Sequence, residues 1–531
     1  MTAIPIELPV RANESAALAD LIFQHAEGKP LTEEARNRLA TRAASLRLQS
    51  VIPYFGSLQH DPVHPSTYYI AVDAQSGGKM RHLLLHLALA SSPASALFPH
   101  SVLIGRMRIG GGPEIVANAI PFAHTDRNAI RTFAEEVDRD FLPRSQGTRP
   151  AISAGDQHPD ISLPAAFQAY RTLLKSANVN LAAIVGVYDS GLWAAIRSGW
   201  REGYTAEAEP IVITGTTNEE VAQSVSAAKD RIESATGFTK FSIDASALFD
   251  TRADTHHPDA WSDTVVAERF ERLFTEKERH WIRGEFAQLD PAVVVRIAIK
   301  FGLGLRISEE LHDTIRRSRA TQESWRNFDF ELVLGGAQLP TTPLELSFCL
   351  HWLKARGRAA QFIAPNLGLE KSRYRFEVLQ PLAHEARRFG ATLSVRSGLH
   401  VTEDVLSQIG KATGGRVHYN ISGELQLQIF DVLAEQPPGS EWRALFDRMQ
   451  EQTGDRSDSR SLGDPYAGRA DGNPILASRL GEVVEERDHN APDGDERTFM
   501  EKLGDLPPKL ISDVRQRNTR YILWLAENLR G

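Results

Sequence analysis

From residue 150 onward, short apolar runs alternate with longer segments of helical periodicity. Eight runs with strand character occupy residues 150–154, 181–187, 210–214, 238–243, 328–334, 360–364, 392–395 and 417–420. Strands that alternate with helices predict a parallel sheet covered by helices. Eight pairs in one run favour an α/β fold of the (β/α)8 TIM-type barrel over a doubly wound sheet.

The segment between the fourth and fifth predicted strands is too long for a simple connection. Residues 245–327 contain helical patterns around 265–286 and 292–319, and a capping box at Thr275 and Glu278 starts a helix within the first of them. Further capping boxes begin at Thr217 and Thr342. We therefore predict a helical insertion after strand 4, and we expect it to cover the mouth of the barrel.

The regions on either side of the barrel have a different pattern. Residues 1–145 predict an N-terminal α+β region, with helices at 14–26 and 32–49 and strands at 67–73 and 101–105. The barrel with its insertion spans 146–435. Residues 436–531 predict C-terminal loops and helices, with exposed loops at 453–473 and 485–497 and a final helix at 510–529.

Composition excludes several classes of function. The chain has 531 residues, a net charge of -8 and no basic run, which argues against a nucleic-acid or membrane surface. Its single cysteine, Cys349, allows no internal disulfide and no multi-cysteine metal site. No stretch approaches the roughly 18 apolar residues of a spanning helix, and no leader is evident, so we expect a cytoplasmic protein with a small-molecule partner. The oligomeric state cannot be inferred.

Candidate active-site residues stand at the predicted carboxyl ends of the strands, where the loops of such a barrel converge. Three have catalytic potential: Asp244, His418 and Arg396. Six more are candidates for substrate binding: Asp156, Ser397, Gly398, Asn420, Ser422 and Gly423. The two Ser-Gly pairs follow strands seven and eight, whose loops often bind an anion, and Arg396 adds a charge suited to a carboxylate.

Each of these residues also has a structural interpretation. Asp244 is the best single carboxylate for acid/base or metal chemistry, but it could instead cap the turn that follows its strand. His418 shares one strand face with Asn420, yet a histidine in a short apolar strand can be a satisfied core residue. The Ser-Gly pairs could be ordinary turns, with Arg396 paired to a structural acid.

Segments of the barrel resemble the tagaturonate epimerases, bacterial enzymes that interconvert the keto sugar acids tagaturonate and fructuronate with a divalent metal ion. The similar segments span about residues 150–435. They are 189–193, 199–204, 237–244, 273–279, 328–331 with 340–343, and 412–415 leading to His418. The resemblance implies a sugar-acid epimerase or isomerase, a uronate substrate and a metal cofactor.

The chain departs from this family where metal and acid/base residues are expected. In the family pattern the third strand ends in Asp-Ala-Asp-His, the fourth runs Asp-Pro-Ser and reaches a His, the fifth ends in Asp-Glu-Thr, and the seventh ends in His-Ser-Gly. Here these positions read Glu-Ala-Glu-Pro at 207–210, Asp-Ala-Ser at 244–246, Gly-Gly-Ala at 335–337 and Arg-Ser-Gly at 396–398. Arginine cannot replace histidine as a metal donor, which puts the implied metal site in doubt.

Two hypotheses follow from this combination. In the first, the chain is an epimerase of this type with an altered site. In the second, it is a catalytically degenerate barrel that binds sugar acids without turnover.

Overall fold

The computed structural model describes residues 51–530 except for a number of segments. These are 62–65, 74–80, 90–96, 99–100, 109–113, 123–126, 156–157, 176–181, 186–187, 322–326, 336–338, 368–375, 397–401, 422, 455–485, 492–494 and 496. The helices predicted at 14–26 and 32–49 lie outside the described residues, as does most of the loop predicted at 453–473.

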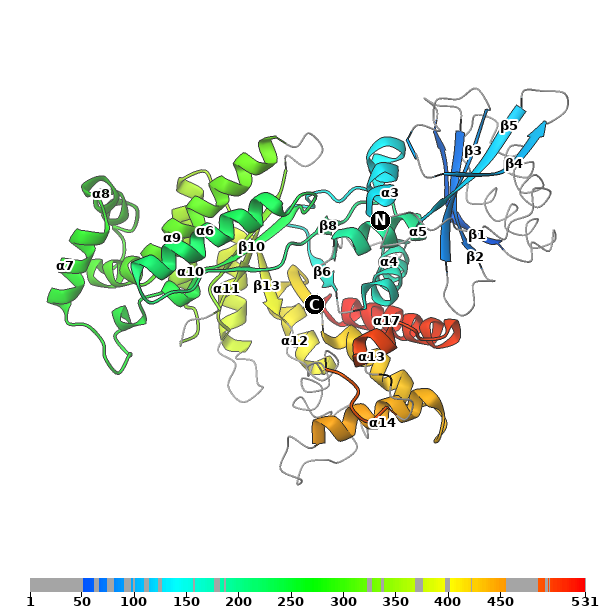
Figure 1. Cartoon of the computed structure of the whole chain (residues 1–531). Helices are drawn as coiled ribbons and strands as arrows, with labels where there is room; N and C mark the ends of the chain where they lie inside the picture. Colours follow the sequence, from blue (N-terminus) through cyan, green and yellow to red (C-terminus); the bar gives the residue numbers. More distant parts are fainter. Residues whose placement is uncertain are drawn as a thin grey trace.

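The first sheet is antiparallel and has the strand order β1-β2-β3-β5-β4 (Figure 1). Its strands are β1 (Val51–Asp61), β2 (Ser66–Asp73), β3 (Arg81–Leu89), β4 (Val102–Arg108) and β5 (Glu114–Pro121). The predicted strands 67–73 and 101–105 correspond to β2 and β4. The chain then passes through α3 (Arg127–Thr132) and the turns η2 (Phe133–Val137) and η3 (Arg139–Phe141) to the second sheet.

The second sheet has the strand order β8-β7-β6-β14-β13-β12-β11-β10-β9. All of its pairings are parallel. The strands are β6 (Ala151–Ala154), β7 (Ala182–Val185), β8 (Thr205–Ala206), β9 (Ile211–Val212), β10 (Lys240–Asp244), β11 (Asp329–Val333), β12 (Phe362–Ala364), β13 (Thr392–Arg396) and β14 (Val417–Ile421). The predicted α/β class, with a parallel sheet, is thereby confirmed.

Backbone contacts link β8 to β10, although β8 stands at the far end of the strand order. Thr239 N donates to Ala206 O at 2.8 Å, and Ala208 N donates to Lys240 O at 2.9 Å. The sequence predicts one strand at 210–214, and β9 lies within it, whereas β8 forms before Pro210 where no strand was predicted. Proline has no N–H to give to a sheet, which accounts for the break between β8 and β9.

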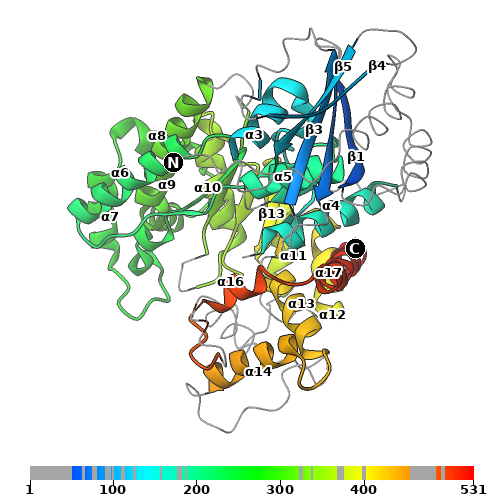
Figure 2. The same cartoon turned by 45° about the vertical axis from the view of Figure 1, so that its right-hand side comes forward.

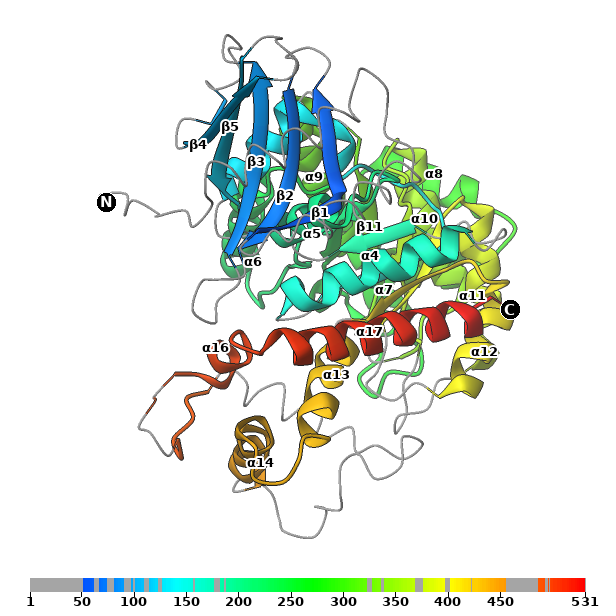
Figure 3. The same ribbon diagram turned by 90° about the vertical axis from the view of Figure 1, so that its right-hand side faces the viewer.

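Helices follow the strands along the chain, as the sequence predicts. They are α4 (Pro159–Lys175), α5 (Tyr188–Ser198), α6 (Asn218–Ser234), α10 (Pro343–Ala355), α11 (Phe376–Arg388), α12 (Glu403–Thr413) and α13 (Gly423–Ala434). The capping boxes predicted at Thr217, Thr275 and Thr342 are all formed. The predicted last helix is α17 (Pro508–Asn528), which lies along α4 (Figure 3). No helix in the described ranges is long and apolar enough to cross a membrane.

The insertion between β10 and β11 contains α7 (Asp263–Leu273), α8 (Glu276–Glu285) and α9 (Pro291–Ala320). The Trp281 ring of α8 packs edge-on against Trp352 of α10, with centroids 5.7 Å apart. Glu285 pairs with His351 of α10 at 3.1 Å. α7 and α8 thus lie on the outer side of α9 and α10, away from the sheet (Figure 1). The expectation that the insertion covers the barrel mouth is not met by these helices.

The C-terminal helices have a core of their own. α13, α14 (Glu441–Gly454), α16 (Phe499–Leu503) and α17 lie together at one end of the molecule (Figure 2). Side chains from all four are buried against one another, including Ile429, Phe446, Phe499 and Val514.

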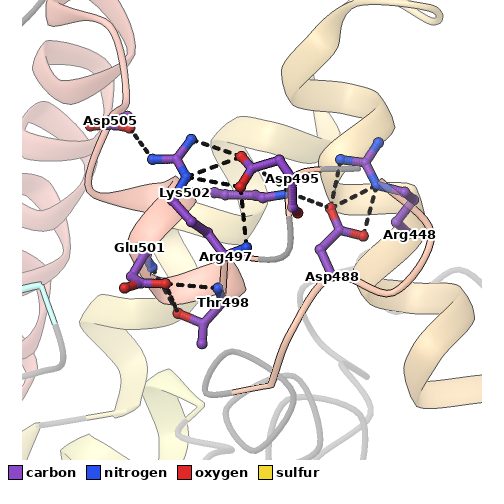
Figure 4. A network of polar contacts seen from close by, with 8 residues as sticks. All are labelled: Arg448, Asp488, Asp495, Arg497, Thr498, Glu501, Lys502 and Asp505. Atoms are coloured by element: carbon purple, nitrogen blue, oxygen red, sulfur yellow. Dashed lines mark hydrogen bonds and ion pairs between the residues drawn. The ribbon is translucent and has the colours of Figure 1, made fainter. Parts of the chain in front are cut away.

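An ion-pair network joins α14 to α16 (Figure 4). Arg448 binds both carboxylate oxygens of Asp488, and Lys502 Nζ donates to Asp488 at 3.0 Å. Asp488 is only 3% exposed. The prediction that 485–497 forms an exposed loop is therefore wrong at this residue. The Asp488 carboxylate can be buried because two cations compensate its charge.

We expect Asp488→Asn to destabilise the α14–α16 contact by about 2–3 kcal/mol, since it removes charged hydrogen bonds from two cations. Burial raises the pKa of the Asp488 carboxyl, but Arg448 and Lys502 outweigh it, and the pKa lies below its usual range. Its contribution is therefore present above the carboxyl's unfolded-state pKa and is lost as pH falls through the folded one. Hydrogen exchange of α14 and α16 measures the loss. Unchanged exchange would show that the network does not stabilise these helices.

Candidate active site

The structure places several predicted site residues at the carboxyl end of the parallel sheet. Asp244 ends β10 and Arg396 ends β13, where Arg396 pairs in register with Asn420 of β14. Gly423 is the first residue of α13. The remaining candidates, Asp156, Ser397, Gly398 and Ser422, lie outside the described residues.

Asp244 makes the contacts of a turn cap. Its Oδ1 accepts hydrogen bonds from Ser246 N at 3.0 Å and from Ser246 Oγ at 2.5 Å. These bonds start the short 3₁₀ turn η4 (Ser246–Leu248). The structural interpretation of Asp244 is thus realised at Oδ1, and the acid/base role stays a prediction.

One layer deeper, charged side chains from several strands meet inside the curled sheet. Lys240 Nζ of β10 donates to Glu207, which follows β8, and to Glu331 of β11 at 2.9 Å. His418 Nδ1 of β14 lies 3.6 Å from Glu331 Oε1. β11 and β14 are not neighbours in the sheet. Their side chains can therefore meet only on its concave face. We call Glu207, Lys240, Glu331 and His418 the charged cluster.

The charged cluster is almost completely shielded from solvent. Lys240 is 0% exposed, His418 1%, Glu331 2% and Glu207 7%. Three serines add hydrogen bonds to the cluster. Ser153 Oγ donates to Glu207 at 3.0 Å, Ser242 Oγ lies within hydrogen-bond distance of both carboxylates, and Ser394 Oγ lies 2.9 Å from His418 Nδ1. The ring of Phe362 packs against His418, with centroids 5.1 Å apart.

The two carboxylates and the ammonium of the cluster stay ionised because their charges compensate one another. Burial alone lowers the pKa of the Lys240 ammonium, but Glu207 and Glu331 reverse this and raise it. Burial alone raises the pKa of Glu331, but Lys240 and His418 hold it well below the usual value. The same balance, with Lys240 as the main partner, lowers the pKa of Glu207.

Sequence reasoning singled out His418 and missed the roles of Lys240 and Glu331. A signal was present in the strands themselves. Lys240, Ser242 and Asp244 alternate along one strand, and Asp329 and Glu331 alternate along the next. Polar residues at every second position of an otherwise apolar strand indicate a polar interior face.

The family resemblance implies a divalent metal ion, and the described donors can be tested against it. No group of three or more His, Cys, Asp or Glu side chains in the described ranges is placed to hold a metal. Where the carboxylates of Glu207 and Glu331 converge, the Lys240 ammonium donates to both. A metal ion there would meet a fixed positive charge, so these donors do not fit it.

The C-terminal helices contact His158, which precedes α4. His158 is buried, and its Nδ1 lies 3.2 Å from Gln426 Oε1 of α13. Its Nε2 lies 3.3 Å from Met500 O of α16. His158 is therefore held by two helices that come much later in the chain.

Comparison with known proteins gives one consistent similarity. No family model matches the chain. The tagaturonate/fructuronate epimerase of Thermotoga maritima is 23% identical over 261 residues, which cover 47% of this chain and 50% of that protein. The chain thus matches about half the length of this curated relative.

Solved structures extend the similarity at the level of fold. The native crystal structure of the fructuronate-tagaturonate epimerase from Cohnella laeviribosi matches with a TM-score of 0.65 at 16% identity, covering 92% of this chain and 99% of that one. A glycerol complex of the same enzyme matches with a TM-score of 0.63 over 94% of this chain and 99% of that one. In part of its sequence and in most of its fold, the chain resembles the tagaturonate epimerases.

Proposed function

We propose that this protein is a sugar-acid epimerase or isomerase that acts on keto uronates such as tagaturonate and fructuronate. Its site would lie at the carboxyl ends of the strands of a closed (β/α)8 barrel, within a domain spanning residues 146–435. The contacts between β8 and β10 support closure of the sheet. The epimerase activity of the similar proteins supports the substrate class.

The observation that carries the proposal is the charged cluster. The interior of a barrel of this kind is normally filled by branched apolar side chains. Here Lys240, Glu207 and Glu331 are buried as ions, although an apolar filling of similar volume would be as stable or more so. A buried arrangement without benefit to stability points to chemistry at this end of the sheet.

The candidate residues suit the chemistry of a keto uronate. Inversion of a carbinol next to a carbonyl needs a proton acceptor and a group that stabilises the enediolate. Inversion one bond further away needs either cleavage and re-formation of a carbon–carbon bond, with the same two requirements, or transient oxidation. We assign proton transfer to His418 and to the carboxylate of Asp244, and charge stabilisation to Arg396.

The other candidates would bind the substrate. The backbone of Ser397, Gly398, Ser422 and Gly423, with Asn420 and Asp156, would surround the sugar acid. We place the protein in the cytoplasm, with a small-molecule partner and no nucleic acid. The barrel domain would be flanked by the N-terminal region 1–145 and the C-terminal region 436–531.

The alternative is a degenerate barrel that binds a sugar acid without turnover. Asp244 favours it, because Oδ1 of this carboxylate is already bound to Ser246. The substituted metal positions favour it as well. Binding alone cannot separate the two functions, whereas turnover can.

We expect Arg396→Ala to weaken keto uronate binding roughly tenfold to several hundredfold, since a guanidinium binds a carboxylate through two charged hydrogen bonds. A neutral ketohexose should bind equally to both proteins. Calorimetric titration of wild type and variant with a keto uronate and its neutral analogue makes the comparison. Equal affinity of the two proteins for the uronate would exclude the role of Arg396.

A further inference from the structure

His418 Nε2 is buried and has no hydrogen-bond partner in the part of the chain that the structure describes. The exposed fraction of the residue is 1%. An imidazole nitrogen so enclosed ordinarily finds a partner, because desolvation without a hydrogen bond is unfavourable. The atom therefore has a hydrogen-bonding capacity that the fold does not use.

The other ring nitrogen has an environment that determines the tautomer. Nδ1 faces Ser394 Oγ at 2.9 Å and Glu331 Oε1 at 3.6 Å. Glu331 is an anion, and a negative charge beside Nδ1 favours a proton on that atom. In a neutral imidazole this leaves Nε2 unprotonated, and its lone pair can accept a hydrogen bond or a proton.

The position of Glu331 is itself fixed. Its Oε2 accepts hydrogen bonds from Lys240 and from Ser242. Lys240 is held on its other side by Glu207. The carboxylate beside His418 is therefore anchored by strands β10 and β8, on the opposite side from β14.

The charged groups nearest to His418 do not cancel one another. Two carboxylates and one ammonium leave one net negative charge inside the sheet. A proton accepted by His418 would neutralise this charge in a region of low dielectric. A proton on the ring is attracted by Glu207 and Glu331 and repelled by Lys240.

We propose that His418 is held as the Nδ1–H tautomer and that Nε2 is the atom that accepts a proton from the keto uronate, with Glu331 and Lys240 as positioning residues. This inference rests on the proposed function. A proton on a carbon next to the carbonyl would pass to Nε2, and its bonding pair would remain on the substrate as an enediolate. If a hydroxyl is the donor, its O–H pair forms the new carbonyl, and the pair of the broken carbon–carbon bond forms the enediolate.

The tautomer can be measured without any assay of activity. In protein labelled with ¹⁵N-histidine, long-range proton–nitrogen correlation spectra distinguish Nδ1–H from Nε2–H rings. The chain has 17 histidines, so the His418 signals are assigned by their loss in His418→Gln. We expect the Nδ1–H pattern in wild type and a shift of the unprotonated Nε2 resonance when tagaturonate or fructuronate is added.

One variant tests the positioning role of Glu331, and a second variant serves as its control. Glu331→Gln should convert part of the population to the Nε2–H tautomer. Ser394→Ala removes only one hydroxyl beside the ring and should retain the Nδ1–H tautomer, provided that both proteins show the wild-type circular dichroism spectrum. If Glu331→Gln does not fold, the wild-type tautomer and its response to uronate still decide the matter.

The outcomes separate the inference from the proposed function. An Nε2–H ring in wild type, or an Nε2 resonance that ignores a uronate whose binding calorimetry detects, would overturn the inference and leave the function standing. An Nδ1–H ring in a protein that neither binds nor converts keto uronates would refute the function, and with it the role of Nε2 toward this substrate.

Discussion

Replacing Lys240 by methionine is expected to lower the free energy of unfolding of the parallel sheet by about 3–5 kcal/mol, because it leaves two buried carboxylates without their cation. Lys240 is 0% exposed and donates to Glu207 and Glu331. Methionine has a similar length and no charge, so the effect reports the lost ion pairs rather than a cavity. Hydrogen exchange of the amides in β10 and β11 measures it.

The effect should depend on pH in a definite direction. In wild type the pKa of Glu331 is lowered, so its contribution to stability is present above the unfolded-state pKa and is lost as pH falls through the folded one. In Lys240→Met, burial without the ammonium should raise the folded-state pKa of Glu207 and Glu331 above their unfolded values. The variant should then be most stable below about pH 4 and should lose stability as pH rises.

A matched control is available on the surface. Lys229 pairs with Glu310 on exposed helices, and the two side chains are 35% and 49% exposed. Lys229→Met should change stability by no more than about 1 kcal/mol. If Lys240→Met were equally mild at neutral pH, the cluster would not be the ionised arrangement described above.

The second large effect concerns catalysis. His418→Gln should reduce the turnover of keto uronates by about 10²–10⁴-fold, the usual contribution of a general acid/base residue. Glutamine keeps a polar side chain beside Ser394 but cannot accept and return a proton. The substrate affinity should change much less, because Arg396 is expected to supply most of the uronate binding. Steady-state kinetics with separate kcat and KM values measure this difference.

His351→Gln is the control for this prediction. His351 pairs with Glu285 and packs on Trp281, in the helical layer outside the sheet. Its replacement should leave kcat within about twofold of wild type, since it contacts neither the charged cluster nor the strand ends. Equal losses in the two variants would show that His418 acts through general stability alone.

Local sequence signals were sufficient for much of the fold. The alternation of strands and helices predicted the parallel strands to within a few residues, and three capping boxes predicted the starts of α6, α8 and α10. These features depend on residues close together in the chain. Strand β8 shows the limit of this reasoning, because the pattern predicted a strand at 210–214 and none before Pro210.

The features that were missed depend on contacts between distant residues. Lys240 is 91 residues from Glu331, and no local pattern indicates that they pair. Asp488 lies in an acidic segment, and its burial follows only from Arg448 and Lys502 on two helices. The outward position of α8 likewise depends on contacts with α10, which the sequence pattern does not indicate.

The most direct test of the proposed function is the incubation of the purified protein with tagaturonate, and separately with fructuronate, in heavy water. Nuclear magnetic resonance then follows both sugar acids, with added Zn²⁺ or Mn²⁺ and with a chelator. We expect each keto uronate to be converted into the other, at a rate that falls in His418→Gln. Tight binding of both sugar acids by calorimetry, with no conversion under any of these conditions, would contradict an epimerase and establish a binding protein instead.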